Sequence, residues 1–159
     1  MKNKMIVVMI VLLITGCATN NTGAEFSQNT TKPKSDTGTI VFYRPHQGNF
    51  MWFGGSIGRW AIAANDKVIT ALGDATYTVV ELPPGQYKFN GKTQLIDTIE
   101  NIEIKPGTIQ YIRAVHRGFS WWNYLILKEV DQAFAEKELQ GLPLQINPEN
   151  WTYILSHGD

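Results

Sequence analysis

The segment Gly54-Gly55-Ser56-Ile57-Gly58 matches a catalytic pattern in this chain of 159 residues. Its Gly-x-Ser-x-Gly spacing is that of a nucleophile elbow, in which a sharp turn between a strand and a helix exposes the serine hydroxyl to a base. The residues that follow, Arg59 to Ile62, have the pattern of a strand and not of a helix. We therefore expect the glycines to form a flexible turn or to allow close backbone packing. Catalysis by Ser56 is the weakest functional hypothesis.

The three histidines, His46, His116 and His157, lie in separate segments without the spacing of metal ligands. The single cysteine, Cys17, offers no thiolate partner for them. No phosphate-binding motif is present, because no Lys-Ser/Thr pair follows the glycine-rich segment. The sequence therefore predicts solvent-facing or hydrogen-bonded histidines, and a protein that is not an enzyme, with no catalytic residues, no metal and no cofactor.

The residue whose chemistry the sequence indicates best is Cys17. Lys2 and Lys4 precede an apolar run of ten residues, 5–14, which is the order of a secretory signal. The run is far shorter than the roughly 20 residues of a membrane-spanning helix. Ile14-Thr15-Gly16-Cys17 then resembles the lipobox of bacterial lipoproteins, in which the cysteine is diacylated and becomes the first residue of the mature chain. The alternative is an ordinary signal peptide with an incidental cysteine.

The lipobox resemblance implies a removed signal peptide, 1–16, and a membrane as partner through the lipid anchor at Cys17. Two or three acyl chains, palmitate among them, hold a domain durably where one chain binds marginally. Ala18 stands where an aspartate is associated with retention in the inner membrane. The expected location is the outer membrane, facing the periplasm.

The mature chain is not basic. Removal of residues 1–16 takes away Lys2 and Lys4 and no acid, so the formal charge falls from 0 to −2. A nucleic-acid partner is therefore not expected. If Cys17 is acylated, no thiol is left for a disulfide.

The segment from Cys17 to Thr37 is polar and rich in turn-forming residues, without apolar periodicity. Such a segment cannot bury enough surface to offset the entropy of ordering. We predict a flexible tether over 17–37, with a root-mean-square reach of roughly 25 Å. Phe26 is interpreted as an incidental apolar residue.

The remaining residues, 38–159, predict one β-rich globular domain. Strand patterns alternate with turn signals about every ten residues, which favours a small antiparallel β-sandwich or open barrel. Tyr124–Val130 is apolar on both faces up to Leu127, which suggests a central strand. One short helix follows, capped by Asp131 and formed by 132–139. Phe134 and Leu139 are its expected buried contacts.

Several strand and turn segments of the domain form a recognisable series. They are Gly38-Thr39-Ile40-Val41-Phe42-Tyr43-Arg44-Pro45, Asn65-Asp66-Lys67-Val68, Leu72-Gly73, Tyr77, Glu81-Leu82-Pro83-Pro84-Gly85-Gln86-Tyr87 and Lys105-Pro106-Gly107 with Tyr111. In these segments the domain resembles the bacterial lipoproteins grouped as domain of unknown function 2846. Asp66 stands where a glycine is usual, and Gln86-Tyr87 replaces a commoner basic or histidine position. The resemblance implies a lipid-anchored β domain without established chemistry, and it assigns no catalytic residues.

Two loops are unusually aromatic. The residues singled out as a candidate binding surface are Trp52, Phe53, Trp60, Trp121 and Trp122 with the nearby Arg59, Arg113 and Arg117. Loops are normally polar, so these either fold back as buried plugs over the ends of a sandwich or form an exposed patch that binds a partner or a membrane interface. The leading hypothesis is a non-enzymatic envelope lipoprotein that binds or scaffolds another envelope component. The alternatives are a structural or stress-related protein without a specific ligand, and a serine hydrolase.

Overall fold

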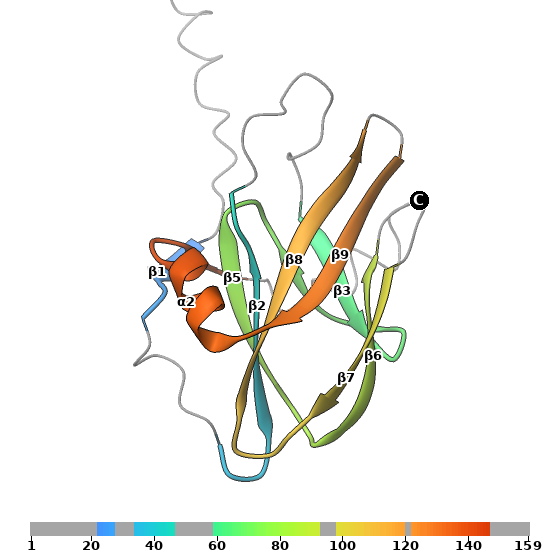
Figure 1. Ribbon diagram of the computed structural model, residues 1–159, viewed down its shortest axis with the longest axis vertical. Helices are drawn as coiled ribbons and strands as arrows, with labels where there is room; N and C mark the ends of the chain where they lie inside the picture. Colours follow the sequence, from blue (N-terminus) through green and yellow to red (C-terminus); the bar gives the residue numbers. More distant parts are fainter. Residues whose placement is uncertain (1–21, 28–33, 47–58, 93–97, 120–121, 147–159) are drawn as a thin grey trace, which may run out of the picture.

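Two β-sheets face each other across an apolar core in the computed structural model, which describes residues 22–27, 34–46, 59–92, 98–119 and 122–146 (Figure 1). One sheet has the order β1-β10-β5-β2-β8-β9, formed by Thr22–Glu25, Pro143–Gln145, Thr76–Leu82, Gly38–Arg44, Ile109–Phe119 and Trp122–Val130. The other has the order β4-β3-β6-β7, formed by Lys67–Leu72, Trp60–Ala64, Gly85–Lys92 and Thr98–Ile104. The pairs β2–β8 and β5–β10 are parallel and the others antiparallel. The prediction of a mainly β sandwich with one short helix is confirmed, and the described strands close no barrel.

The central strand is β2, in which every one of the seven residues is buried. Side chains alternate between the faces of a strand. Ile40 and Phe42 therefore point into the core between the sheets, while Val41 and Tyr43 belong to a second core on the outer face. That second core is closed by the helix α2 (Gln132–Leu139), whose Ala135 and Leu139 are buried in it.

The two sheets approach each other closely where Gly91 of β6 meets Leu125 of β9. A Cβ atom added at Gly91 would lie 2.7 Å from the Cβ and 2.9 Å from the Cδ2 of Leu125. Because real Cβ atoms do not come this close, only glycine leaves room for Leu125 in the core. The packing of β9 against the second sheet depends on this contact.

The prediction of a central strand over Tyr124–Val130 is wrong, because β9 is an edge strand of the six-stranded sheet. Leu125 and Leu127 are buried between the sheets, while Ile126 on the opposite face is only half-buried. The apolar character of the strand reflects its contacts with β6 and β7 of the other sheet.

The short helix is confirmed, with one correction. The side chain of Asp131 accepts a hydrogen bond from the backbone N–H of Phe134 at 2.8 Å, which makes it the N-cap. Leu139 is buried as expected, but Phe134 is 45% exposed. The buried helix position near it is Ala135.

The prediction of a flexible tether over 17–37 needs correction at residues 22–26. Residues Thr22–Glu25 form the strand β1, which pairs with β10. The N–H of Phe26 then donates to the carbonyl of Leu142 at 2.9 Å. The ring of Phe26 meets Tyr77 edge-to-face at 5.3 Å, so this residue is a packing contact and not incidental. Phe26 is a single apolar residue in a polar segment, so the sequence pattern did not indicate that this segment pairs with the edge of a sheet.

The strand directions give the sandwich two ends. We call one the Asp74 end; it comprises residues 44–46, 59–60, 73–76 and 116–119, where β2 and β8 finish and β3 and β5 begin. The opposite one, the Pro106 end, carries the turns at 65–66, 83–84 and 105–108. Of the strands that flank the two aromatic segments of the sequence, β2 and β8 end at the Asp74 end, and β3 and β9 begin there. Within the described ranges, no helix is long and apolar enough to cross a membrane.

Candidate functional site

The last residue of β2, Arg44, is a fully buried charge. It lies on the same face of the strand as Ile40 and Phe42, because side chains on one face recur at every second residue. The sequence therefore places a guanidinium at the Asp74 end of the core between the sheets, with 0% of it exposed. Burial lowers the pKa of Arg44, and the carboxylate of Asp74 offsets part of that effect.

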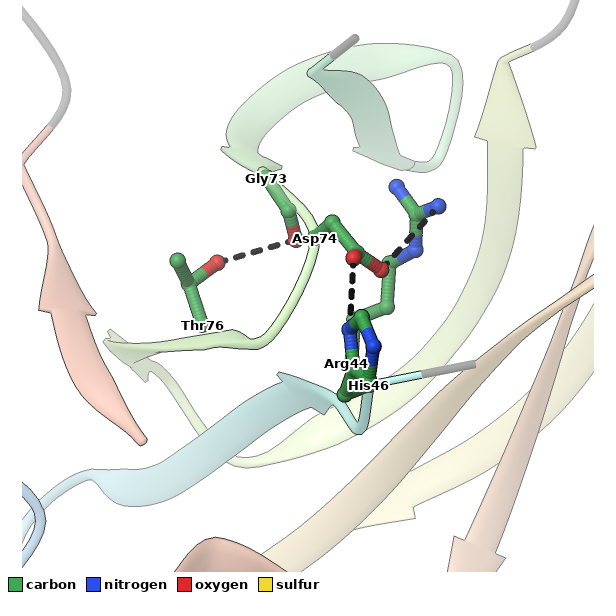
Figure 2. Close-up of polar contacts among 5 residues, drawn as sticks. All are labelled: Arg44, His46, Gly73, Asp74 and Thr76. Carbon is green, nitrogen blue, oxygen red and sulfur yellow. Dashed lines mark hydrogen bonds and ion pairs between the residues drawn. The ribbon is translucent and has the colours of Figure 1, made fainter. Parts of the chain in front are cut away.

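Asp74 links Arg44 to His46 (Figure 2). Its Oδ1 lies 3.5 Å from Nη2 of Arg44, and its Oδ2 lies 3.0 Å from Nδ1 of His46. The hydroxyl of Thr76 donates to the carbonyl of Gly73 at 3.0 Å, which ties down the turn that presents Asp74. The side chain of Asp74 is 24% exposed and that of His46 is 60% exposed. The cluster thus runs from the core to solvent.

Two kinds of chemistry fit this cluster. A carboxylate on Nδ1 of a histidine is the arrangement that orients a general base toward a nucleophile in Ser-His-Asp enzymes. Ser56, the candidate nucleophile, lies outside the described residues. The same carboxylate also neutralises a buried arginine, which is a structural role.

A second ionic cluster, in which Glu138 is the acceptor, joins the helix to the sheet. Arg113 on β8 donates to Glu138 of α2 through two nitrogens, Nε to Oε2 at 2.6 Å and Nη2 to Oε1 at 2.7 Å. The hydroxyl of Tyr43 donates to Oε2 at 3.0 Å. The guanidinium carbon of Arg113 also lies 5.7 Å from the centre of the Phe134 ring, a cation–π distance. This cluster fixes the helix on the outer face of β2 and β8.

The protonation states follow from these contacts. Burial alone would raise the pKa of Glu138, but hydrogen bonds from Arg113 and Tyr43 bring it below its ordinary value. The hydrogen bond to Glu138 raises the pKa of Arg113. Burial, followed by the hydrogen bond to Glu138, raises the pKa of Tyr43. The folded state therefore favours an ionised Glu138 and a protonated Tyr43.

The structure brings together only part of the predicted aromatic surface. Trp60 is half-buried, contacts the core between the sheets, and has its ring centre 5.1 Å from that of His116. Arg59 precedes it at the Asp74 end and is also half-buried. Arg113 lies on the outer face of β8 with Glu138, apart from Trp60. For Trp60 the contacts favour the buried-plug interpretation.

The other predicted residues lie where the structure gives no side-chain description. Cys17, Trp52, Phe53, Ser56, Trp121 and His157 are outside the described residues, and for Trp122 only the backbone, paired with Phe119, is described. His46 is exposed and bonded to Asp74, in agreement with the sequence analysis. No group of three or more potential metal ligands occurs among the described residues.

Neither ionic cluster was predicted from the sequence. Arg44 could have been suspected, because it continues the inward-facing pattern of β2 into a charged residue. Its partner Asp74 lies 30 positions further along the chain, and no local pattern connects the two. The helix that contains Glu138 was likewise predicted from the sequence, but its contact with Arg113 was not.

Comparison of the chain with protein-family models, with curated proteins and with solved structures gives no significant match. The resemblance to the domain of unknown function 2846 therefore stays a prediction.

Replacement of Asp74 by alanine tests the role of the buried pair. We expect the free energy of unfolding to fall toward the lower end of the roughly 3–5 kcal/mol known for breaking a buried ion pair, because Asp74 is partly exposed. Adding Arg44→Met to Asp74→Ala should recover most of the loss. Urea denaturation followed by tryptophan fluorescence measures both. Glu103→Ala, an exposed acid on β7, serves as control and should change stability by no more than about 0.5 kcal/mol. A double variant as unstable as Asp74→Ala contradicts the ion-pair explanation.

Acid titration of stability tests Glu138. Because its pKa is lower in the folded state, its contribution is complete above the ordinary carboxyl pKa of about 4.3 and is lost as the pH falls through the lower folded value. Glu138→Gln should therefore flatten the loss of stability below that pH, and Tyr43→Phe should give an intermediate slope. Chemical denaturation between pH 7 and pH 3 measures this. If the free energy of unfolding falls with decreasing pH in the same way for the wild type and Glu138→Gln, the cluster makes no contribution to the pH dependence of stability.

Proposed function

We propose that this protein is a lipid-anchored component of a bacterial envelope, attached through Cys17, whose β-sandwich binds or scaffolds another envelope component without carrying out chemistry. The observation that carries the proposal is the order of a ten-residue apolar run followed directly by Ile14-Thr15-Gly16-Cys17. Two or three acyl chains on one cysteine give durable attachment. The outer membrane, on its periplasmic side, is the proposed location, because Ala18 follows the cysteine.

The ionic contacts of the domain support a non-enzymatic role. Arg44 is neutralised by Asp74, and Arg113 is held by Glu138 through two hydrogen bonds. Both arrangements stabilise strand ends and the helix, which is what a rigid binding module requires. The expected partner is another envelope protein. A structural or stress-related protein without a specific ligand is the alternative within the same location.

Replacement of Cys17 by serine tests the anchor. In cells fed a palmitate analogue, we expect the wild type to be labelled and to fractionate with the outer membrane. Cys17→Ser should be unlabelled and should appear as a soluble or unprocessed protein. Cys17→Ser that still fractionates fully with the outer membrane would refute the anchor.

A serine hydrolase is the second candidate, and the contact between His46 and Asp74 favours it. In acyl-transfer enzymes, a carboxylate orients the histidine that acts as the general base, and Asp74 contacts the imidazole of His46 in the same way. A fluorophosphonate probe on the purified protein distinguishes the two functions. We expect labelling of the wild type no stronger than that of Ser56→Ala. Labelling that is lost in both Ser56→Ala and His46→Ala would establish the hydrolase instead.

A further inference from the structure

Few residues separate Cys17 from the first strand of the domain in the sequence. β1 begins at Thr22, so only residues 18–21 lie between the proposed lipid attachment and the sheet. Five steps of extended chain span at most about 18 Å. Without β1, the next residue whose backbone is bonded to the sandwich would be Thr37, which accepts from the N–H of Gly107, and the intervening chain could extend to about 72 Å. The docking of β1 therefore limits how far the domain can move from a lipid anchor.

The docking of β1 rests on several described contacts. Thr22 pairs with Gln145 and Glu25 with Pro143 in the antiparallel pair β1–β10. The Phe26 ring packs on Tyr77, whose hydroxyl donates to the carbonyl of Ala24 at 3.4 Å. Burial raises the pKa of Tyr77, in keeping with its place under the segment. These contacts fix the position of Thr22 on the six-stranded sheet.

Thr22 lies beside the Asp74 end of the sandwich. Its partner Gln145 has its side-chain oxygen 2.8 Å from the position that a Cβ on Gly73 would take. Gly73 belongs to the same turn as Asp74, which contacts Arg44 and His46. A chain of direct neighbours therefore connects the start of β1 with the Asp74 end.

The two ends of the sandwich differ in charge. Across the ranges that define the Asp74 end, the buried Arg44 and Asp74 offset each other. The other two charged side chains of these ranges are the half-buried Arg59 and the exposed Arg117, both positive. The edge strand β1 adds one exposed acid, Glu25. Across residues 34–37, 65–67, 81–85, 103–108 and 129–131 at the Pro106 end, six acids, Asp36, Asp66, Glu81, Glu103, Glu129 and Asp131, stand against Lys34, Lys67 and Lys105. Anionic lipid headgroups attract the first end and repel the second.

We infer that β1 is a fixed strap that holds the Asp74 end against the membrane in which Cys17 is anchored, with the exposed Arg117 and the half-buried Arg59 toward anionic headgroups. The inference rests on the proposed lipid attachment of Cys17. Beyond that attachment, the inference specifies how the domain is oriented. The Pro106 end, with its acidic turns, points away from the lipid and toward partners in the periplasm.

Single cysteine labels test the orientation, because the chain has no cysteine other than Cys17. Ile146→Cys places a label next to Thr22 on a side chain that is 41% exposed, and Lys105→Cys places one on an exposed residue of the opposite end. The full lipidated chain, labelled with a fluorophore, is reconstituted into phosphatidylethanolamine–phosphatidylglycerol vesicles that carry a headgroup quencher. We expect at least about threefold stronger quenching at 146 than at 105.

Two further variants test the strap itself. Fifteen Gly/Ser residues inserted between Asn21 and Thr22 should reduce quenching at 146 to the level found at 105, because the spacer no longer limits the distance. Phe26→Ser, which removes the contact with Tyr77, should act in the same direction, while Phe26→Leu, which keeps an apolar side chain there, should retain the wild-type pattern. Arg117→Glu should weaken quenching at 146 in anionic vesicles.

The outcomes separate the inference from the proposed function. Vesicle-bound, palmitate-labelled protein with equal quenching at the two positions overturns the orientation and leaves the anchor in place. Quenching at 146 that survives the insertion overturns the role of β1 as a strap. Protein that carries no palmitate and does not float with the vesicles refutes the anchor, and the inference falls with it.

Discussion

The structure depends on the burial of β2 on both of its faces. A strand flanked by other strands can cover one face with a second sheet, and here the four-stranded sheet covers Ile40 and Phe42. The other face carries Val41 and Tyr43, and it needs a further layer. Since each large apolar side chain contributes roughly 1.5–3 kcal/mol on burial, leaving that face exposed would cost much of the stability of a small domain. The helix α2 supplies most of this layer, and Phe26, which follows the edge strand β1, packs against the same cluster.

The same alternation that buries Ile40 and Phe42 also buries Arg44. A charge at the end of an apolar core is costly unless an opposite charge reaches it. Asp74 supplies this charge from the turn between β4 and β5, in register with the strand end, where Arg44 pairs with Thr76. The same carboxylate contacts the exposed His46, which follows two residues after Arg44 in the chain. The cluster that most resembles a catalytic arrangement therefore has a sufficient structural cause.

Local chemistry made part of this fold predictable. Asn65 and Asp66 both adopt positive φ in a two-residue hairpin turn, Gly107 does so in the turn before β8, and Asp131 caps the helix. In each case the residue type itself limits the backbone conformation. Strand positions followed in the same way from β-branched and aromatic runs.

The rest depended on contacts between distant segments. β1 has no strand pattern of its own, and it exists because β10 and Tyr77 accept it. The edge position of β9, the exposure of Phe134 and the pairing of Arg44 with Asp74 were likewise decided by neighbours far along the chain. For the candidate site, the sequence indicated that the aromatic Trp60 needed an explanation and that His46 was solvent-facing or hydrogen-bonded, but only the strand directions place the two residues at one end.

The outer layer connects the two proposals. Phe26 contacts Tyr77, Tyr77 pairs in register with Tyr43, and Tyr43 donates to Glu138, which holds Arg113. Anything that loosens α2 from the sheet therefore also weakens the surface on which β1 docks. If Cys17 is lipidated, the angle of the domain at the membrane is set by this layer and not by the core between the sheets. A polar segment that looks like a spacer would then act as an orienting element, because one phenylalanine has a place to pack.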